Sequence, residues 1–123
     1  MTEFSPDQVD SALAQLHAFE ARYVADPHSN LNPFSRPGLE AATVAAALEL
    51  WKEGTTKAGR QRVDAAAARR LLRDLIARNL VESTGHHRTL SEGSKHVECF
   101  APFGFMARRK ALLEARRITV EEN

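Results

Sequence analysis

Arginines gather around a run of four alanines in the segment GRQRVDAAAARRLLRDLIARNLVE, which spans Gly59 to Glu82. The guanidinium group presents a planar fork of N–H donors that suits phosphate oxygens and the edge of guanine. The helix predicted within this segment contains only two carboxylates, Asp64 and Asp74, whereas exposed helices usually intersperse both signs. We interpret the arginines as a surface for an acidic partner. The alternative is that arginine, a good helix former, only solubilises the outer face of a core helix.

Charge is distributed unevenly along the 123 residues, although the formal net charge is only +1. Residues 1–50 contain two basic and seven acidic residues, whereas residues 51–96 contain ten basic and five acidic ones. A local basic patch attracts a polyanion even when the whole protein is nearly neutral. The same asymmetry also allows the acidic and basic segments to pair with each other, within one chain or across a dimer.

Histidine and cysteine side chains are the candidates for metal binding or nucleophilic catalysis. His86, His87, His96 and Cys99 all have side chains that zinc accepts as ligands. If residues 95–100 form a strand, His96 and Cys99 project from opposite faces, and no C-x-x-C or H-x-x-x-H pair supports a site. The sequence also lacks a glycine-rich phosphate loop and a nucleophile elbow. We therefore expect no metal site, no cofactor, no catalytic residue and no enzymatic activity.

Length and composition favour one domain over residues 1–123, with 43% hydrophobic and 27% charged residues. The longest mostly apolar run, residues 39–51, is far shorter than the roughly 20 residues that cross a bilayer. The N-terminus lacks the basic and apolar regions of a secretory signal. Cys99 has no second cysteine with which to form an internal disulfide. We expect a cytoplasmic protein with no membrane partner.

The first predicted helix spans residues 6–25. Ser5 and Gln8 form an S-x-x-Q capping box, and apolar residues then recur at spacings of three and four. Three prolines in residues 26–38 predict a loop, pinned to the core by Leu31 and Phe34.

The next two predicted helices are separated by the polar stretch GTTKAGRQR. The first of them covers residues 39–53, with Trp51 on its buried face and Gly54 at its end. The polar stretch is predicted to be a connection, with one possible helical turn starting at Thr55 or Thr56. The second helix runs from Asp64, its N-cap, to about Asn79. Its buried stripe is predicted to comprise Ala68, Leu71, Leu72, Leu75 and Ile76, continued by Leu80. Its opposite face is predicted to carry Ala66, Arg69, Arg70 and Arg73, with Arg62 pointing toward the same region.

The C-terminal third changes character. Alternating residues around two glycine-containing turns predict a β-hairpin or small meander after Asn79, with Val97 and Cys99 on its inner face. Residues 105–117 are predicted to form a last helix that partly buries Met106, Leu112 and Leu113.

This order of elements over residues 39–101 resembles the winged helix-turn-helix superfamily of DNA-binding domains, most specifically in RRLLRDLIARNLVES. The resemblance implies a mainly helical, winged-helix-like single domain with a small β-hairpin and extra N- and C-terminal helices. It also implies that an arginine-rich helix enters the major groove and that a β wing contacts the backbone. The residues that it places on double-stranded DNA are Lys57, Arg60, Arg62, Arg69, Arg70, Arg73, His86, His87 and Arg88.

Two functional hypotheses follow. The first is a small DNA-binding regulator of the transcriptional, plasmid or phage type, acting as a homodimer through its N- and C-terminal helices. The second is an interaction module or inhibitor that docks its basic face on an acidic protein or a nucleoprotein complex. The second gains weight from GTTKAGRQR, which replaces the short helix and tight turn usual in the superfamily, and from a wing with few basic residues.

Overall fold

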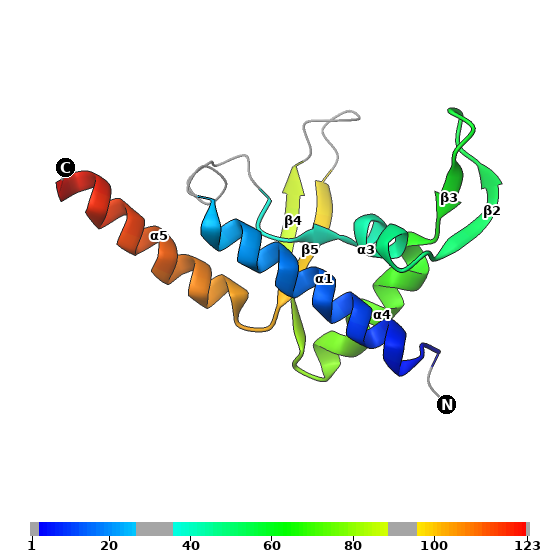
Figure 1. The fold of residues 1–123 in the computed structure, drawn as a ribbon, viewed down its shortest axis with the longest axis horizontal. Coiled ribbons are helices and arrows are strands. Elements are labelled where there is room, and N and C mark those ends of the chain that lie inside the picture. The colour runs from blue at the N-terminus through cyan, green and yellow to red at the C-terminus, as the bar shows by residue number, and fades with distance from the viewer. Residues whose placement is uncertain (1–2, 27–35, 89–95, 123) are drawn as a thin grey trace.

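The structure, a computed structural model, describes residues 3–26, 36–88 and 96–122. These residues form four helices and two small antiparallel sheets (Figure 1). In chain order the elements are α1 (Pro6–Ala25), β1 (Leu39–Glu40), α3 (Ala41–Ala47), β2 (Trp51–Thr55), β3 (Gln61–Val63), α4 (Ala65–Ala77), β4 (Val81–Arg88), β5 (His96–Pro102) and α5 (Phe105–Glu122). The chain therefore mixes α and β structure, with more helix than strand, as the sequence predicts in outline.

Helix α1 begins and ends where the sequence predicts. Ser5 Oγ accepts a hydrogen bond from the Gln8 backbone N–H at 3.2 Å, and Gln8 Oε1 accepts one from the Ser5 N–H at 2.9 Å. These two bonds form the capping box and satisfy donors that the first helical turn cannot pair internally. The apolar stripe of α1 buries Ala12, Leu16 and Tyr23, so this helix supplies one wall of the core.

The single helix predicted over residues 39–53 is wrong, because this segment divides into three elements. β1 pairs with β5, α3 covers only seven residues, and the chain then turns at Glu49, whose φ is 56°. The segment continues as β2, which leaves Trp51 42% exposed instead of buried. The helix ends at Ala47, before this turn, and the strand that follows contains Trp51 and Thr55, two residue types that favour β structure.

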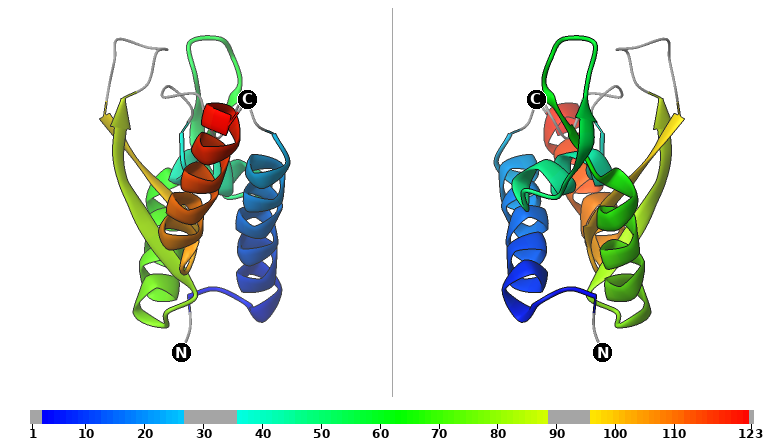
Figure 2. Two further views of the ribbon diagram at one scale, coloured as in Figure 1. Left: turned by 90° about the vertical axis from the view of Figure 1, so that its left-hand side faces the viewer. Right: turned by 90° about the vertical axis from the view of Figure 1, so that its right-hand side faces the viewer.

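The predicted polar connection, and the helical turn considered at Thr55 or Thr56, are replaced by the turn and second strand of a hairpin. Trp51 pairs with Val63 across β2 and β3, and the Thr56 N–H donates to the Arg60 carbonyl at 2.8 Å. Gly59, with φ at 76°, supplies the left-handed conformation that the turn requires. All five residues of β2 are exposed, and the hairpin extends beyond the helices that flank it (Figures 1 and 2).

Helix α4 contributes the largest apolar face of the core. Asp64 Oδ1 accepts a hydrogen bond from the Ala67 N–H at 3.0 Å, which confirms the predicted N-cap. The predicted stripe is buried at Ala68, Leu71, Leu72 and Leu75, and partly buried at Ile76. The helix ends at Ala77, two residues earlier than predicted, and Asn79 then turns the chain with φ at 58°. Leu80 consequently leaves the stripe and is 37% exposed.

The predicted C-terminal hairpin is confirmed as β4 and β5, and β1 extends it to a three-stranded sheet in the order β1-β5-β4. The register places Leu39 opposite Phe100 and Val81 opposite Pro102, with a bulge between Ser83 and Gly85. The C-terminal half of β5 is buried, because both α1 and α3 pack against this central strand. In the views of Figure 2, α1 lies on one side of the molecule and the β4–β5 hairpin lies on the other.

Helix α5 extends five residues past its predicted end. Its first turn is capped by a side chain from β4: Glu82 Oε1 accepts from the Gly104 N–H at 2.6 Å, and Glu82 Oε2 accepts from the Met106 N–H at 2.9 Å. A carboxylate at this position also interacts favourably with the positive end of the helix dipole. Glu82 therefore determines where α5 starts and how it leaves the sheet. The three apolar residues predicted to be partly buried on α5 are so: Met106, Leu112 and Leu113.

The core contacts expected of Leu31 and Phe34 lie outside the residues that the structure describes. Across the described residues, none of the helices combines the length and the apolar composition needed to span a bilayer.

The Glu82 cap leads to a test of stability. We expect Glu82→Ala to lower the free energy of unfolding by about 1 kcal/mol, the usual cost of losing a helix cap. Urea denaturation followed by far-UV circular dichroism measures this loss. Glu114→Ala, which removes an exposed carboxylate from α5 itself, is the matched control and should stay within about 0.5 kcal/mol of the parent. Equal stabilities of the two variants would contradict the capping role.

Candidate nucleic-acid interface

The outer face of α4 presents the side chains that the sequence assigns to it. Burial of the leucines on one side turns Ala66, Arg69, Arg70 and Arg73 toward solvent, and all four are exposed. The predicted orientation of this helix is therefore confirmed. Its chemistry differs from the prediction, because acids from other parts of the chain approach it.

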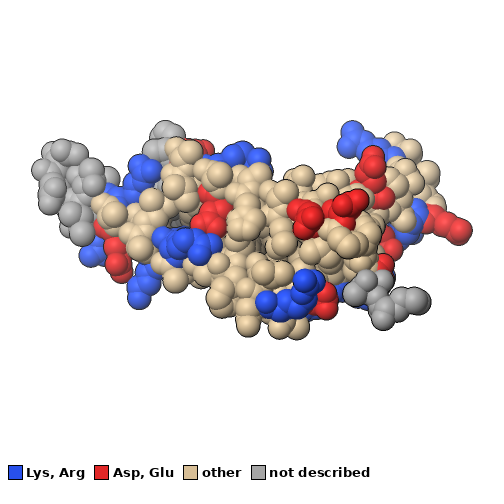
Figure 3. Space-filling view, turned by 60° about the horizontal axis from the view of Figure 1, so that its bottom comes forward, with Lys and Arg blue, Asp and Glu red and all other residues tan. Residues whose placement is uncertain are grey.

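The N-terminal segment supplies the first of these acids. Arg70 Nη2 lies 2.8 Å from Glu3 Oε1, and Arg70 Nε donates to the same carboxylate at 2.9 Å. The hydrogen bond with Glu3 raises the pKa of Arg70, and the carboxylate engages the Nε and Nη2 donors of the guanidinium. Near the end of α4, Arg78 Nη1 lies 3.7 Å from Asp74 Oδ2. This face therefore has more carboxylates near its arginines than the sequence of α4 alone indicates. Figure 3 shows the same mixing on the side that it draws, where basic and acidic groups lie among one another.

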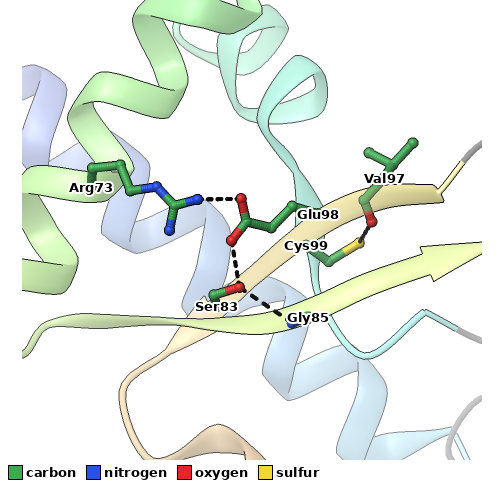
Figure 4. Close-up of polar contacts among 6 residues, drawn as sticks. All are labelled: Arg73, Ser83, Gly85, Val97, Glu98 and Cys99. Carbon is green, nitrogen blue, oxygen red and sulfur yellow. Dashed lines mark hydrogen bonds and ion pairs between the residues drawn. The ribbon is translucent and has the colours of Figure 1, made fainter.

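The sheet supplies the second acid, which holds Arg73 (Figure 4). Arg73 Nη2 forms an ion pair with Glu98 Oε1, and the other oxygen of Glu98 accepts from Ser83 Oγ at 2.6 Å. The Gly85 N–H donates to Ser83 Oγ at 3.3 Å, at the bulge of β4. The guanidinium carbon of Arg73 also lies 5.6 Å from the centre of the Phe100 ring, within cation–π range. Arg73 therefore connects α4 to β4 and β5.

Arg69 differs from its two neighbours. It is exposed, and no ion pair within the described residues involves it. Its guanidinium donors remain available to an anionic partner. Of the three arginines on this face, Arg69 is thus the one whose charge no acid in the described part of the chain matches.

The β2–β3 hairpin adds further cations next to the start of α4. Lys57, Arg60 and Arg62 are all exposed, and no ion pair in the described part of the chain involves them. Arg62 pairs across the hairpin with Lys52, an exposed cation that the sequence does not assign to this surface, because it falls within the helix predicted over residues 39–53. Gly54 and Gly59, which flank Thr55–Ala58, are the sequence signal for a turn at this place. Hairpin and helix are joined through Asp64 alone, so these cations and Arg69 belong to adjacent elements.

The residues predicted to lie on the wing differ in their exposure to solvent. His86 is exposed on β4, opposite Glu98, whereas His87 is half-buried. His87 Nε2 donates to the Thr84 carbonyl at 2.7 Å, so this ring bonds to its own strand. The backbone of Arg88 ends β4, but its side chain lies outside what the structure describes. The wing therefore brings one exposed histidine, not a cluster, to the described surface.

The remaining reactive groups do not converge. In residues 3–26, 36–88 and 96–122, no three histidine, cysteine, aspartate or glutamate side chains gather as metal ligands would. Cys99 is fully buried, and this burial raises the pKa of its thiol. The thiol donates to the Val97 carbonyl at 3.9 Å (Figure 4). Cys99 thus packs as a small apolar residue, in agreement with its predicted place on the inner face of the hairpin.

Comparison with known proteins finds no match to a protein-family model and none to a curated protein. The proposal for its function therefore rests on the geometry of this chain.

The connection made by Arg73 can be tested by a double-mutant cycle. We expect Arg73→Ala and Glu98→Ala each to destabilise the fold, with a coupling energy of about 1 kcal/mol because Arg73 is half-exposed while Glu98 is mostly buried. Urea denaturation of both single variants and the double variant gives this energy. Arg69→Ala should change stability by less than about 0.5 kcal/mol. A coupling energy of zero would show that the ion pair does not hold α4 to the sheet.

Proposed function

We propose that residues 39–101 form a winged-helix unit and that the protein is a small DNA-binding regulator. The observation that carries this proposal is the order β1, α3, the β2–β3 hairpin, α4, β4, β5, with β1, β4 and β5 arranged in one sheet as β1-β5-β4. In a winged helix, a helix that precedes the hairpin enters the major groove of DNA. Helix α4 holds that position in the chain, and it presents an exposed arginine face.

The contacts with DNA come from the N-terminal half of α4 and from the β2–β3 hairpin. Arg69 contacts a base edge or phosphate in the major groove, and the small side chain of Ala66 permits close approach of the helix. The hairpin cations Lys57, Arg60 and Arg62 contact phosphates, which fix the orientation of the protein on the duplex. His86 and Arg88 lie on β4, where a wing would meet the backbone.

Arg70 and Arg73, unlike Arg69, are already paired with carboxylates of the protein. Each is engaged by a carboxylate of the protein, and DNA phosphates would have to compete with Glu3 or Glu98 for it. Exposed ion pairs contribute only about 0–1 kcal/mol, so Arg70 can exchange Glu3 for a phosphate. Arg73 is held additionally by Phe100 and by a mostly buried acid, so it positions α4 and does not read bases.

A second candidate function is docking on an acidic protein surface or a nucleoprotein complex. It is favoured by the ion pairs of Arg70 and Arg73, which reduce the charge density that a polyanion would meet. It is also favoured by the β2–β3 hairpin, which stands where the superfamily has a tight turn. The two candidates differ in whether bare duplex DNA is bound.

Fluorescence polarisation of a labelled random duplex, titrated at several salt concentrations, tests DNA binding. We expect affinity to fall steeply with salt, because binding releases counterions from the phosphates. The double variant Arg62→Ala/Arg69→Ala should weaken binding and reduce the slope of log K against log salt by about 0.9 for each phosphate that the protein no longer neutralises. Arg78→Ala removes an exposed arginine from the far end of α4 and is the matched control.

The outcomes separate the candidates. A double variant that binds like the parent, or like Arg78→Ala, would contradict the assigned face. No binding by the parent even at low salt would contradict DNA binding and favour the protein partner.

A further inference from the structure

Helix α5 is under-packed for its length. It contains 18 residues, but Phe105 is the only one of its described side chains, those of residues 105–117, that is fully buried. Helices in proteins gain most of their stability from packing an apolar face, and isolated helices of about this length are marginal in water. Leu112 and Leu113 remain only half-buried. The described part of α5 thus has apolar side chains that stay partly exposed.

Long polar side chains hold α5 alongside α1. Arg108 forms a bidentate pair with Glu20 at 2.7 and 2.8 Å, and this bond lowers the pKa of Glu20. Further along, Arg109 Nε donates to the Tyr23 hydroxyl at 2.9 Å, and Arg116 Nη2 donates to the Val24 carbonyl at 3.2 Å. These contacts fix the direction of α5 but leave space between the two helices.

That space is a groove of about 610 Å³. Apolar residues line most of it: Ala21, Val24, Ala25 and Phe103. Val24 is 43% exposed and Phe103 is 54% exposed. They are two of the four large apolar side chains that are exposed among the described residues. His17, Glu20 and Arg108 form the polar part of the lining. An apolar centre with a polar rim is the composition of a protein interface.

We infer that a second copy of this chain occupies the groove, with α5 of each copy lying in the groove of the other. One chain carries both complementary parts, an open apolar groove and an adjacent helix whose leucines, Leu112 and Leu113, are only half-buried. This arrangement allows a closed two-fold dimer in which the same patch serves on both subunits. Charge is also complementary: apart from the Arg108–Glu20 pair formed within each chain, α1 contains two acidic residues and one basic residue, whereas α5 contains four basic and three acidic ones.

The position of the groove agrees with this occupant. Helix α5 and the β2–β3 hairpin lie at opposite ends of the molecule in Figure 1. A second copy at α5 therefore leaves the hairpin and the start of α4 uncovered. The inference does not require DNA binding, because self-association is measured without any nucleic acid.

Sedimentation equilibrium of the full-length protein over a range of concentrations tests this dimer. We expect the parent to dimerise, and Val24→Glu to raise the dissociation constant at least about tenfold, because it places a charge in the apolar centre of an interface. Phe103→Glu should do the same from the other side of the groove. Far-UV circular dichroism checks that each variant is folded. Thr43→Glu makes the same change at an exposed β-branched residue of α3 and should dimerise like the parent.

Two results would overturn the inference. One is a parent protein that stays monomeric at all concentrations, which would leave the groove to a different molecule. The other is a dimer that neither Val24→Glu nor Phe103→Glu weakens, which would place the interface elsewhere. Loss of DNA binding in the Arg62/Arg69 variant with an intact dimer would show that the two surfaces act separately.

Discussion

Burial of the leucine stripe of α4 is the constraint on which the rest of the structure depends. Leu71, Leu72 and Leu75 are fully buried, and removing such side chains from water contributes roughly 1.5–3 kcal/mol each. Helix α3 packs against this stripe, and α4 in turn contacts β4. When α4 buries its leucine face, the opposite face of the helix is left to solvent. The same burial therefore exposes the arginines. Core packing and the proposed interface are thus two consequences of one amphipathic pattern.

Electrostatics then distinguishes arginines that look equivalent in the sequence. Glu98 and Phe100 hold Arg73 against the sheet, and Glu3 pairs with Arg70, while Arg69 has no such partner in the described residues. The result is a face with one unmatched arginine beside the cations of the β2–β3 hairpin. The proposed contact surface therefore lies nearer the start of α4 and the hairpin than the arginine count of the helix suggests. The groove at α5 is a separate surface at the other end.

The features that the sequence predicts correctly are those encoded locally. The Ser5 cap, the Asp64 cap and the periodic leucines of α4 involve residues three or four positions apart. The helix predicted over residues 39–53 is wrong because alanines suit a helix and Trp51 falls seven residues after Val44, which imitates a continuing stripe. The ion pairs of Glu3 and Glu98 join residues 67 and 25 positions apart from their arginines. Only the folded arrangement brings such acids to α4, so spacing along the helix could not reveal them.

The central claim is that duplex DNA binds at the start of α4 and on the β2–β3 hairpin. The most direct measurement is an NMR titration of the isotope-labelled protein with a short duplex, following the backbone amide chemical shifts. The account predicts that the largest shifts fall in residues 52–69, with smaller ones on β4 and none along the exposed side of α1. Shifts concentrated on α1 and α5, or no shifts at low salt, would contradict it.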